Sequence, residues 1–381
     1  MPAARRARRL DVEAAMDQAL RWARRGLARA RPNPLVGAAV LRDGRLVGRG
    51  WHTRFGGPHA EAMALEDAGR AARGATLVVT LEPCAHYGKT PPCTEAILQA
   101  GVRRVVAATL DPNPLVAGRG LARLRRGGVS VQVGCGAAAA LGLNEGYFST
   151  HVRGRPWVTL KVACTLDGKL AAADGTSRYI SGPDTLRLAH RLRTEYHAIL
   201  VGRGTVEADD PQLNARLVAG TSPVKVVLDG RGRLRPTLRV FDVREAPALW
   251  VTGPGVPRAR REPVVARGVE HVEVPRARSG GLDLRRVLRE LSRRGLQSLL
   301  VEGGSEVLTA FLNAGLVDRV MVAVAPRLLG QGNRDWLGDI RVRTMRHIRP
   351  LLFPEVREMG TEALFTGYLT DPSDLLEGWV L

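Results

Sequence analysis

Three side chains of the types that bind zinc, and one carboxylate, stand close together in the first quarter of the sequence. His59 and Glu61 belong to the segment Pro-His-Ala-Glu, and Cys84 and Cys93 follow with eight residues between them. One imidazole and two thiolates leave the fourth position of a tetrahedral zinc ion for water, which is the pattern of a catalytic site. Zinc lowers the pKa of its water from about 15.7 to about 7. The pattern predicts a hydrolytic zinc centre beside which Glu61 carries the proton.

Each fragment of this pattern also has an ordinary structural explanation. A His-Ala-Glu at the start of a helix is often an exposed polar turn, and a lone Pro-Cys often contributes a small buried side chain. Their combination favours zinc, because a predicted helix follows each group of ligands and a predicted strand precedes the cysteines. Cys135 and Cys164 have no such neighbours and are expected to pack in the core.

The His-Ala-Glu and Pro-Cys segments resemble the zinc-dependent cytidine and nucleobase deaminase family. The eight-residue gap and the sequence PCAHYGKTPPC resemble its riboflavin-biosynthesis branch, as do the segments 33–37 and 111–118. The resemblance implies that His59, Cys84 and Cys93 bind Zn²⁺ and that Glu61 is the proton carrier. It also implies a pocket for a phosphorylated diaminopyrimidinone, lined by Asn33, His52, His86, Lys89, Thr90, Asp111 and Asn113.

The chemistry of these residue types agrees with the implied pocket. Lys89 offers a point charge for phosphate, and the amide of Asn33 and the carboxylate of Asp111 can form hydrogen bonds with the edge of a pyrimidine. Asn33 and Asp111 also precede prolines, and such dipeptides are common in ordinary turns. From residue type alone, the turn and the binding interpretations of these two residues are equally supported.

A second group of motifs lies in the other part of the chain. The sequence Val-Glu-Gly-Gly, ending at Gly304, stands at the end of a predicted strand and directly before a predicted helix. Paired glycines let a ligand approach the backbone, and the free N–H groups of a helix N-terminus suit a phosphate. The complete GxGxxG fingerprint of a Rossmann dinucleotide site is missing, which argues against a Rossmann dehydrogenase.

The order of motifs here resembles the reductase domain of the bifunctional riboflavin-biosynthesis deaminase/reductase family, whose fold is dihydrofolate-reductase-like. These motifs are LKVACTLDGKLA, SRYISGP, AILVGRGTVEADDPQLNAR, VEGGS and AGLVDRVMVAVAPRLLG. The resemblance implies contacts to NADPH from Ala163, Tyr179, Thr205, Asp209, Gly304, Ser305, Glu306, Val307, Leu308, Thr309 and Ala310. It implies a sugar-phosphate site formed by Ser177, Arg193, Leu213, Arg216 and Glu302, where Lys161 also polarises the substrate.

Two positions depart from the family pattern. Tyr179 stands where the family usually has tryptophan, and it keeps an aromatic face. Gly230 replaces a small hydroxyl residue that normally helps to bind the cofactor, which weakens the expected preference for NADPH over NADH. Arg231 or Arg233 can compensate for that missing group.

The elements that position these residues alternate between helix and strand. An amphipathic helix over 12–26 and a hairpin of strands 36–41 and 45–51, with a turn at Asp43-Gly44, open the chain. Further helices and strands follow to about residue 133, and a second alternating series begins at 157. The segment 256–281 is predicted to be a loop. We therefore expect two α/β domains. The resemblances imply that residues 1–150 form a cytidine-deaminase-like α/β/α deaminase domain and that residues 151–381 form a dihydrofolate-reductase-like α/β reductase domain.

The length and composition fit a folded protein of two domains. The chain has 381 residues and a formal net charge of +20, which by itself suggests a polyanionic partner. Its arginines are scattered rather than clustered, so we expect no nucleic-acid partner. No membrane-spanning segment or targeting signal is visible, and a cytoplasmic location is expected. The resemblance also implies that the protein forms homo-oligomers.

The expected function is hydrolytic deamination of the diaminopyrimidinone, followed by reduction of the ribosyl chain to ribityl with NADPH. One alternative is a deaminase of tRNA or DNA bases. The net charge is consistent with this alternative, but the eight-residue gap between the cysteines and the cofactor-like second domain argue against it. Another is a structural zinc module joined to a ligand-sensing segment. The sequence gives no indication of which side chain supplies the proton in the reduction.

Overall fold

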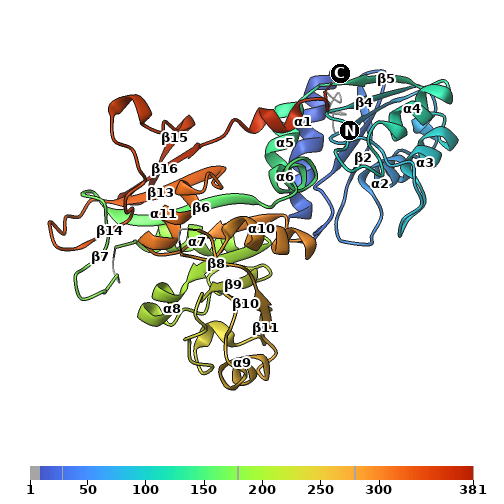
Figure 1. Cartoon of the computed structure of the whole chain (residues 1–381). Helices are drawn as coiled ribbons and strands as arrows, with labels where there is room; N and C mark the ends of the chain where they lie inside the picture. The colour runs from blue at the N-terminus through green and yellow to red at the C-terminus, as the bar shows by residue number, and fades with distance from the viewer. Residues whose placement is uncertain (1–8, 28, 178–179, 279, 381) are drawn as a thin grey trace, which may run out of the picture. The chain divides into compact units, whose positions relative to one another are not determined.

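The computed structural model describes residues 9–27, 29–177, 180–278 and 280–380. The chain forms two compact units, of which the first comprises Met1–Arg153 with Pro372–Leu381 and the second comprises Gly154–Asp371 (Figure 1). The division differs from the predicted one at the end of the chain, where residues 372–380 pack with the first unit. There Leu375 is fully buried, and the backbone N–H of Leu110 donates to the carbonyl oxygen of Trp379 at 2.8 Å. In the described part of the chain, no helix has both the length and the apolar character needed to cross a bilayer.

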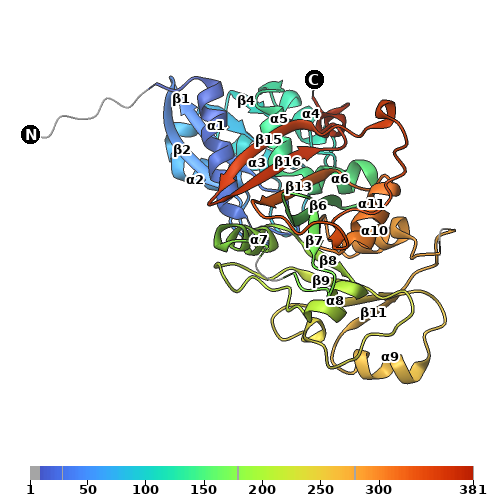
Figure 2. The same cartoon turned by 90° about the vertical axis from the view of Figure 1, so that its left-hand side faces the viewer.

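The first unit contains a five-stranded sheet with the strand order β2-β1-β3-β4-β5. Its strands are drawn in blue to teal in Figures 1 and 2. Strand β1 pairs antiparallel with β2 and β3, whereas β3, β4 and β5 run parallel. The turn between β1 and β2 has positive φ at both Asp43 and Gly44, as a tight hairpin turn requires, so the predicted hairpin is confirmed. The strands are β1 (Gly37–Arg42), β2 (Arg45–Trp51), β3 (Thr76–Val79), β4 (Arg104–Ala107) and β5 (Ser130–Val133).

Helices cover both faces of this sheet. In β1, Ala38 and Val40 pack with helices α2, α3 and α4, whereas Ala39 and Leu41 pack with α1 and α5 on the opposite face. This is the three-layer α/β/α arrangement expected from the sequence. The helices are α1 (Val12–Ala23), α2 (Ala60–Ala68), α3 (Cys93–Gln99), α4 (Arg119–Arg126), α5 (Ala137–Leu143) and α6 (Glu145–Arg153), and the short 3₁₀ segments are η1 (Arg24–Gly26), η2 (Gly69–Ala72) and η5 (Pro372–Leu376).

The second unit is built on a nine-stranded sheet with the order β11-β10-β9-β8-β12-β6-β13-β16-β15. The strands from β11 to β13 in this order run parallel, and β16 and β15 are added antiparallel at one edge. The strands are β6 (Trp157–Thr165), β8 (Ala198–Gly202), β9 (Val224–Leu228), β10 (Ala248–Thr252), β11 (Glu270–Glu273), β12 (Ser298–Val301), β13 (Arg319–Ala325), β15 (Leu352–Met359) and β16 (Glu362–Tyr368).

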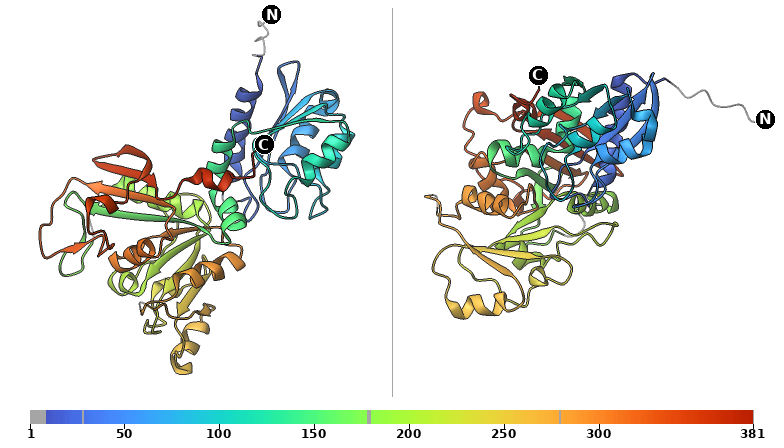
Figure 3. Two further views of the ribbon diagram at one scale, coloured as in Figure 1. Left: turned by 45° about the horizontal axis from the view of Figure 1, so that its top comes forward. Right: turned by 90° about the vertical axis from the view of Figure 1, so that its right-hand side faces the viewer.

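Alternate residues of the central strands face two different cores. Leu299 and Val301 of β12 pack with helices α10 and α11, whereas Leu300 between them packs with α7 on the other face. Figures 2 and 3 show α7 in green and the helices α10 and α11 in orange. Both faces of the parallel sheet are therefore covered, which explains its continuous apolar strands. The helices are α7 (Pro183–Glu195), α8 (Arg203–Asp209), α9 (Arg258–Val265), α10 (Leu284–Arg293) and α11 (Ser305–Asn313), with 3₁₀ segments η3 (Arg239–Phe241) and η4 (Met345–His347).

The prediction of a loop over 256–281 was wrong in part, because this segment contains helix α9 and strand β11. Its arginines, glycines and Pro263 hide the periodicity that would identify these elements. Tertiary packing stabilises them instead: Val264 of α9 is fully buried in a cluster with Trp250 and Val269.

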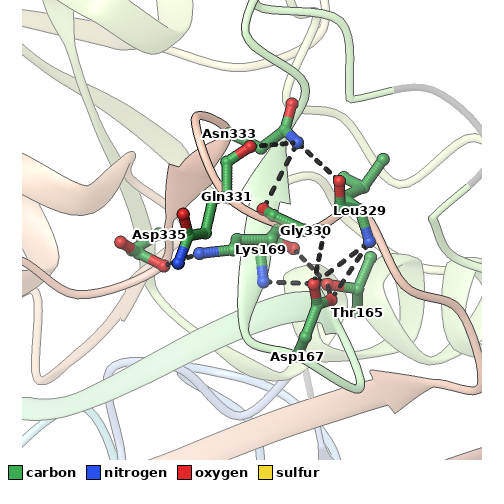
Figure 4. A network of polar contacts seen from close by, with 8 residues as sticks. All are labelled: Thr165, Asp167, Lys169, Leu329, Gly330, Gln331, Asn333 and Asp335. Carbon is green, nitrogen blue, oxygen red and sulfur yellow. Dashed lines mark hydrogen bonds and ion pairs between the residues drawn. The ribbon is translucent and has the colours of Figure 1, made fainter.

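A polar network joins two loops of the second unit through the small sheet formed by β7 (Lys169–Ala171) and β14 (Arg334–Asp335). The carboxylate of Asp167 accepts hydrogen bonds from the backbone N–H groups of Leu329 and Gly330, and Lys169 forms an ion pair with Asp335 at 2.6 Å (Figure 4). The lysine of the LDGK motif thus has a structural role here.

Candidate active sites

Close packing of helix α2 on strand β2 sets the position of the first group of chemical residues. A Cβ atom at Gly50 would overlap the carbonyl oxygen of Ala60, so only glycine lets the helix approach this closely. His59 is the N-cap residue of α2, and Glu61 lies in its first turn. The segment His-Ala-Glu is therefore fixed at the N-terminal end of a well-packed helix.

The three predicted metal ligands converge in space. The Nδ1 atom of His59 lies 3.2 Å from the Sγ of Cys93 and 3.6 Å from the Sγ of Cys84, and the three donor atoms all lie within 4.8 Å of one another. Zinc bond lengths at tetrahedral angles place neighbouring donor atoms about 3.6–3.8 Å apart. The arrangement therefore fits a tetrahedral zinc ion with three protein ligands.

The neighbours of the ligands support this assignment. The Nε2 atom of His59 lies 3.4 Å from the hydroxyl oxygen of Thr90, which leaves Nδ1 facing the two sulfurs. A hydrogen bond with Cys93, assisted by one with His59, lowers the pKa of Cys84 to about 4 against the effect of burial. Thiolate is the form that binds metal.

Glu61 lies beside the ligands and is 3% exposed. Burial raises the pKa of its carboxyl to about 7, and the charge of His59 acts in the opposite direction. A cation at the three ligands would also oppose this increase, because it favours the carboxylate form. The position is suitable for a group that accepts and releases a proton.

A cavity of about 260 Å³ opens at this centre. All the predicted deaminase residues except Cys93 line it, and Cys93 lies in an adjoining hollow with His59 and Thr90. The structure thus brings together residues that are up to 80 positions apart in the sequence, between Asn33 and Asn113.

On one side of the cavity, a short hydrogen-bonded chain orients two predicted substrate-binding residues. The Nδ1 of His52 lies 3.0 Å from the carbonyl oxygen of Pro58, and its Nε2 lies 3.1 Å from the amide nitrogen of Asn33. The carbonyl requires a proton on Nδ1, so Nε2 accepts from Asn33 and His52 is neutral. Burial lowers the pKa of His52, in agreement with this state.

Asp111 lies on another side of the cavity and is 6% exposed. Its Oδ1 accepts hydrogen bonds from the backbone N–H of Asn113 and from the hydroxyl of Tyr147, both at 2.8 Å. Burial outweighs these hydrogen bonds and raises the pKa of Asp111 to about 7. Tyr147 was not identified from the sequence, where no motif distinguishes it from a core tyrosine.

Glu82 is a second residue whose role the sequence did not reveal. Its buried carboxylate accepts from the backbone N–H groups of Asp111, Gly118 and Leu121, at 3.1, 2.8 and 3.1 Å. Gly118 is the N-cap of α4 and Leu121 lies in its first turn, so Glu82 caps this helix from a distant part of the chain. The only indication of this role in the sequence was that Glu82 stands close to Cys84, in the segment Glu-Pro-Cys.

The mouth of the cavity carries positive charge. The ammonium of Lys89 lies 3.9 Å from the centre of the Phe55 ring, in a cation–π contact that orients an exposed side chain. The Nδ1 of His86 is buried and has no hydrogen-bond partner among the described residues. Both residues are therefore available to a polar ligand.

The second unit has a separate cavity of about 470 Å³ at the ends of β6 and β12. Of the predicted reductase residues, Lys161, Ala163, Ser177 and Glu302 line it. Arg193 forms an ion pair with Glu302, with 2.7 Å between Nη2 and Oε2, and also donates to the carbonyl oxygen of Asn214. The Asn214 side chain accepts from Arg216, so both predicted arginines lie next to Asn214.

The charged residues of this group change one another's pKa values. Burial lowers the pKa of Lys161. Burial acts to raise the pKa of Glu302, but the charges of Arg193 and Lys161 outweigh it and the net change is a decrease. The pKa of His190 is lowered to about 4 by burial and by the two arginines. Neither His190 nor Glu362 was identified from the sequence, because no motif contains them; the Oε1 of Glu362 accepts the N–H of Gly182 at 2.6 Å.

The predicted cofactor residues do not all share one surface. Thr205 of α8 lies beside Gly304, the N-cap of α11, with its hydroxyl 3.5 Å from the position of a Cβ at residue 304. Leu308 is fully buried in the core, and Thr309 accepts the N–H of Gly338. A helix turns successive side chains to different faces. Only part of the segment 304–310 can therefore face a ligand.

Three further predicted positions lie outside the second cavity or outside the described residues. Asp209 ends helix α8, and Leu213 is buried with a positive φ of 57°. Tyr179 lies outside the described residues.

Comparisons with known proteins cover both units. Residues 10–109 match the family described as the cytidine and deoxycytidylate deaminase zinc-binding region, and residues 156–370 match the RibD C-terminal domain. The riboflavin biosynthesis protein RibD of Aquifex aeolicus is 41% identical over 91% of this chain and 95% of its own length. That of Escherichia coli is 39% identical over 91% and 96%.

Solved structures agree. The RibD structure of Acinetobacter baumannii (form 1) is 37% identical, with a TM-score of 0.85 over 94% of this chain and 98% of its own. A diaminohydroxyphosphoribosylaminopyrimidine deaminase/5-amino-6-(5-phosphoribosylamino)uracil reductase of Thermotoga maritima is 37% identical, with a TM-score of 0.80 over the same shares. The chain therefore belongs to the RibD family of riboflavin biosynthesis, and it joins a zinc-binding deaminase region to a reductase domain.

Proposed function

We propose that the first unit hydrolyses an exocyclic amine of 2,5-diamino-6-(5-phosphoribosylamino)pyrimidin-4(3H)-one, with Glu61 as the proton carrier. Water supplies the oxygen, ammonia leaves, and the ring carbon exchanges its C–N bond for a C–O bond. Bound zinc at His59, Cys84 and Cys93 supplies the Lewis acidity that makes water a nucleophile near neutral pH. The observation that carries this assignment is the convergence of the three donor atoms beside a buried carboxylate.

The residues around the cavity divide the tasks of binding. The contact with His52 orients Asn33, and the hydrogen bond from Tyr147 orients Asp111. Both side chains suit the donors and acceptors of a pyrimidine edge. Lys89 at the exposed rim provides a point charge for the substrate phosphate. Glu61 takes the proton from water and delivers it to the departing amine.

The second unit then reduces C1 of the sugar, in its ring-opened form, with hydride from NADPH. One hydride and one proton are added, the ribosyl chain becomes ribityl, and NADP⁺ leaves. The Arg193–Glu302 pair lies beside Lys161, and polar atoms of Arg193, Glu302 and His190 are buried without partners among the described residues. Because native proteins rarely leave buried polar atoms unpaired, this group fits a polar substrate.

The nucleotide fits the other part of the same sheet edge. The N-terminus of α11, after Gly303 and Gly304, offers free N–H groups to a pyrophosphate. A Cβ at Gly204 would meet no atom within 4 Å, so there is open space for a ligand beside this glycine. NADPH supplies the hydride, and the protein orients it against the sugar.

The function is tested by supplying the diaminopyrimidinone to the full chain with and without NADPH and identifying the products by mass. We expect the deaminated ribosyl compound without NADPH and the ribityl compound with it. Glu61→Gln should retain zinc and abolish ammonia release, whereas Glu66→Gln, an exposed change on the same helix, should have no effect. Ammonia release by the Glu61→Gln variant at the normal rate would contradict the role of Glu61.

A further inference from the structure

Arg276 fills the position where the chain lacks an expected polar side chain. Gly230 follows strand β9 and has no side chain to offer a ligand. The Nη2 of Arg276 donates to the carbonyl oxygen of Gly230 at 2.7 Å, and its Nη1 lies 3.6 Å from where a Cβ at residue 230 would stand. The guanidinium therefore lies next to the position that a hydroxyl at residue 230 would have.

The adjoining strand leaves space for this arginine. Gly253 follows β10, and a Cβ there would come within 2.9 Å of the carbonyl oxygen of Gly230 and within 3.2 Å of the guanidinium carbon of Arg276. Such a distance is too short for ordinary packing against a rigid planar group. Glycines at the ends of two neighbouring strands thus hold the guanidinium across the edge of the sheet.

That edge is where a nucleotide would bind. Strands β9, β10 and β12 are parallel, so Arg276 lies at the same edge of the sheet as Gly303, Gly304 and the start of α11. In parallel α/β sheets, ligands bind outside the carboxyl ends of the strands. Strand β9 is separated from β12 only by β8, which places the two ends about 10 Å apart across the sheet. The adenosine half of a dinucleotide can span this distance.

The charge of Arg276 is available to an anion. Its side chain is exposed, and no carboxylate among the described residues forms an ion pair with it. Its contacts are to backbone carbonyl oxygens, those of Gly230 and, at 3.4 Å, Gly280. These contacts orient the guanidinium without neutralising it, and its remaining N–H groups can bind a phosphate.

We propose that Arg276 binds the 2′-phosphate of NADPH and so determines the preference of the reductase for NADPH over NADH. The inference rests on the proposed reductase function. Arg276, rather than Arg231 or Arg233, would then compensate for the missing hydroxyl at Gly230. Those two side chains are exposed and have no fixed polar contact within the part of the chain that the structure describes.

The experiment measures binding of adenosine 2′,5′-bisphosphate and of AMP to the full-length chain by calorimetry. These ligands differ only in the 2′-phosphate. Arg276→Ala should weaken binding of the bisphosphate by about tenfold to a hundredfold, the value of one charged hydrogen-bonded contact, and leave AMP binding unchanged. The KM for NADPH should increase by a similar factor while that for NADH stays constant.

Arg278→Ala is the matched control, because it removes an exposed arginine two residues away on the same loop, and it should leave both affinities unchanged. The double variant Gly230→Ser/Arg276→Ala should regain part of the bisphosphate affinity, since Gly230 has an ordinary backbone conformation that serine can adopt. Unaltered bisphosphate binding by Arg276→Ala, or an equal loss of AMP binding, would overturn the proposal. If the parent chain bound neither ligand and oxidised no NADPH, the reductase assignment itself would fail.

Discussion

The side chain of Glu82 accepts the backbone N–H of Asp111 at 3.1 Å, and it thereby ties the strand that leads to Cys84 to the loop that carries Asp111 and Asn113. The same carboxylate also binds the N–H groups of Gly118 and Leu121. One buried side chain thus connects the metal centre to the predicted wall of the substrate pocket. The loop is held by backbone hydrogen bonds to a carboxylate rather than by its own sequence.

Glu82→Gln should loosen this loop. Glutamine keeps one acceptor oxygen but replaces the other with an amide group that cannot accept, so at least one backbone N–H loses its partner. We expect a loss of about 1–3 kcal/mol in unfolding free energy.

The KM for the pyrimidine should increase more than kcat falls, because the change acts on binding residues. Denaturant unfolding and steady-state kinetics measure both, with Glu66→Gln as control. A fall in kcat at constant KM would show that Glu82 does not act through the loop.

Asp111→Asn should change how stability depends on pH. The folded-state pKa of Asp111 is about 7, above its ordinary value of 3.8, so between these values the folded state binds a proton that the unfolded chain releases. The stabilising contribution is fully present below about pH 4 and is lost as the pH rises to about 7. Asparagine removes this dependence and can still accept from Tyr147 and Asn113 through one oxygen.

Relative to the parent chain, Asp111→Asn should therefore gain stability between pH 4 and 7, by about 4 kcal/mol at most. Thermal unfolding midpoints at several pH values measure the difference. Asp43→Asn, at an exposed carboxylate in the β1–β2 turn, is the matched control for the exchange of a carboxylate for an amide. Parallel pH profiles for the Asp111→Asn variant and its parent would contradict the raised pKa. Deamination should fall in the Asp111→Asn variant because the pocket loses a charge.

Removal of the metal should separate the two activities. A chelator, or Cys84→Ala, should abolish zinc content and ammonia release, because each of the three ligands is needed to fix the coordination. NADPH oxidation with the deaminated substrate should persist. Elemental analysis and the two assays test this, and Cys135→Ala, at a cysteine outside the three-ligand group, should retain zinc. Full deaminase activity in a zinc-free sample would disprove the metal assignment.

Arg193→Ala should damage the reductase more than loss of one surface charge would. The pair with Glu302 has side-chain exposures of 13% and 12%, so removing the guanidinium leaves a nearly buried carboxylate without its partner. Breaking such a pair costs about 3–5 kcal/mol in fully buried cases, and about 2 kcal/mol is expected here.

The KM for the sugar phosphate should increase in Arg193→Ala while that for NADPH changes little. Arg191→Ala, at an exposed position on the same helix, is the control. A double-mutant cycle with Glu302→Gln measures the coupling. Additive effects of the two substitutions would show that the ion pair has no energetic role.

Leu375→Ala should destabilise the first unit although it follows the second in sequence. Leu375 is fully buried, and truncation of a buried leucine costs about 2–5 kcal/mol. Deaminase activity should lose heat stability while the reductase keeps its own, and Glu377→Gln, on an exposed neighbour, should alter neither. Equal loss of both activities on heating would contradict the assignment of this segment to the first unit.

Several helices and strands, and both groups of chemically active residues, could be predicted from the sequence. Helical periodicity predicted the helix that begins at Val12, and Asp43-Gly44 predicted the hairpin, because periodicity and turn chemistry act over a few residues. The metal ligands were identifiable because histidine and cysteine at this spacing have few other combined uses. Strand β15, by contrast, is exposed on nearly every residue and contains Pro354, so no alternation indicated it. Helix α5 was missed because its run of alanines, leucines and glycine has no polar face.

Which distant groups meet depends on the folded arrangement of the strands and helices. The hydrogen bonds from Asp111 to Glu82 and from Tyr147 to Asp111 join residues 29 and 36 positions apart, and the Arg193–Glu302 pair joins residues 109 apart. The placement of Arg276 beside Gly230 depends on the order of parallel strands. Such contacts form because the folded sheet aligns strand ends, and a local pattern contains no information about which strands become neighbours. The metal ligands and the reductase motifs could thus be found from local residue types and spacing, whereas the side chains that support them could be found only from the folded chain.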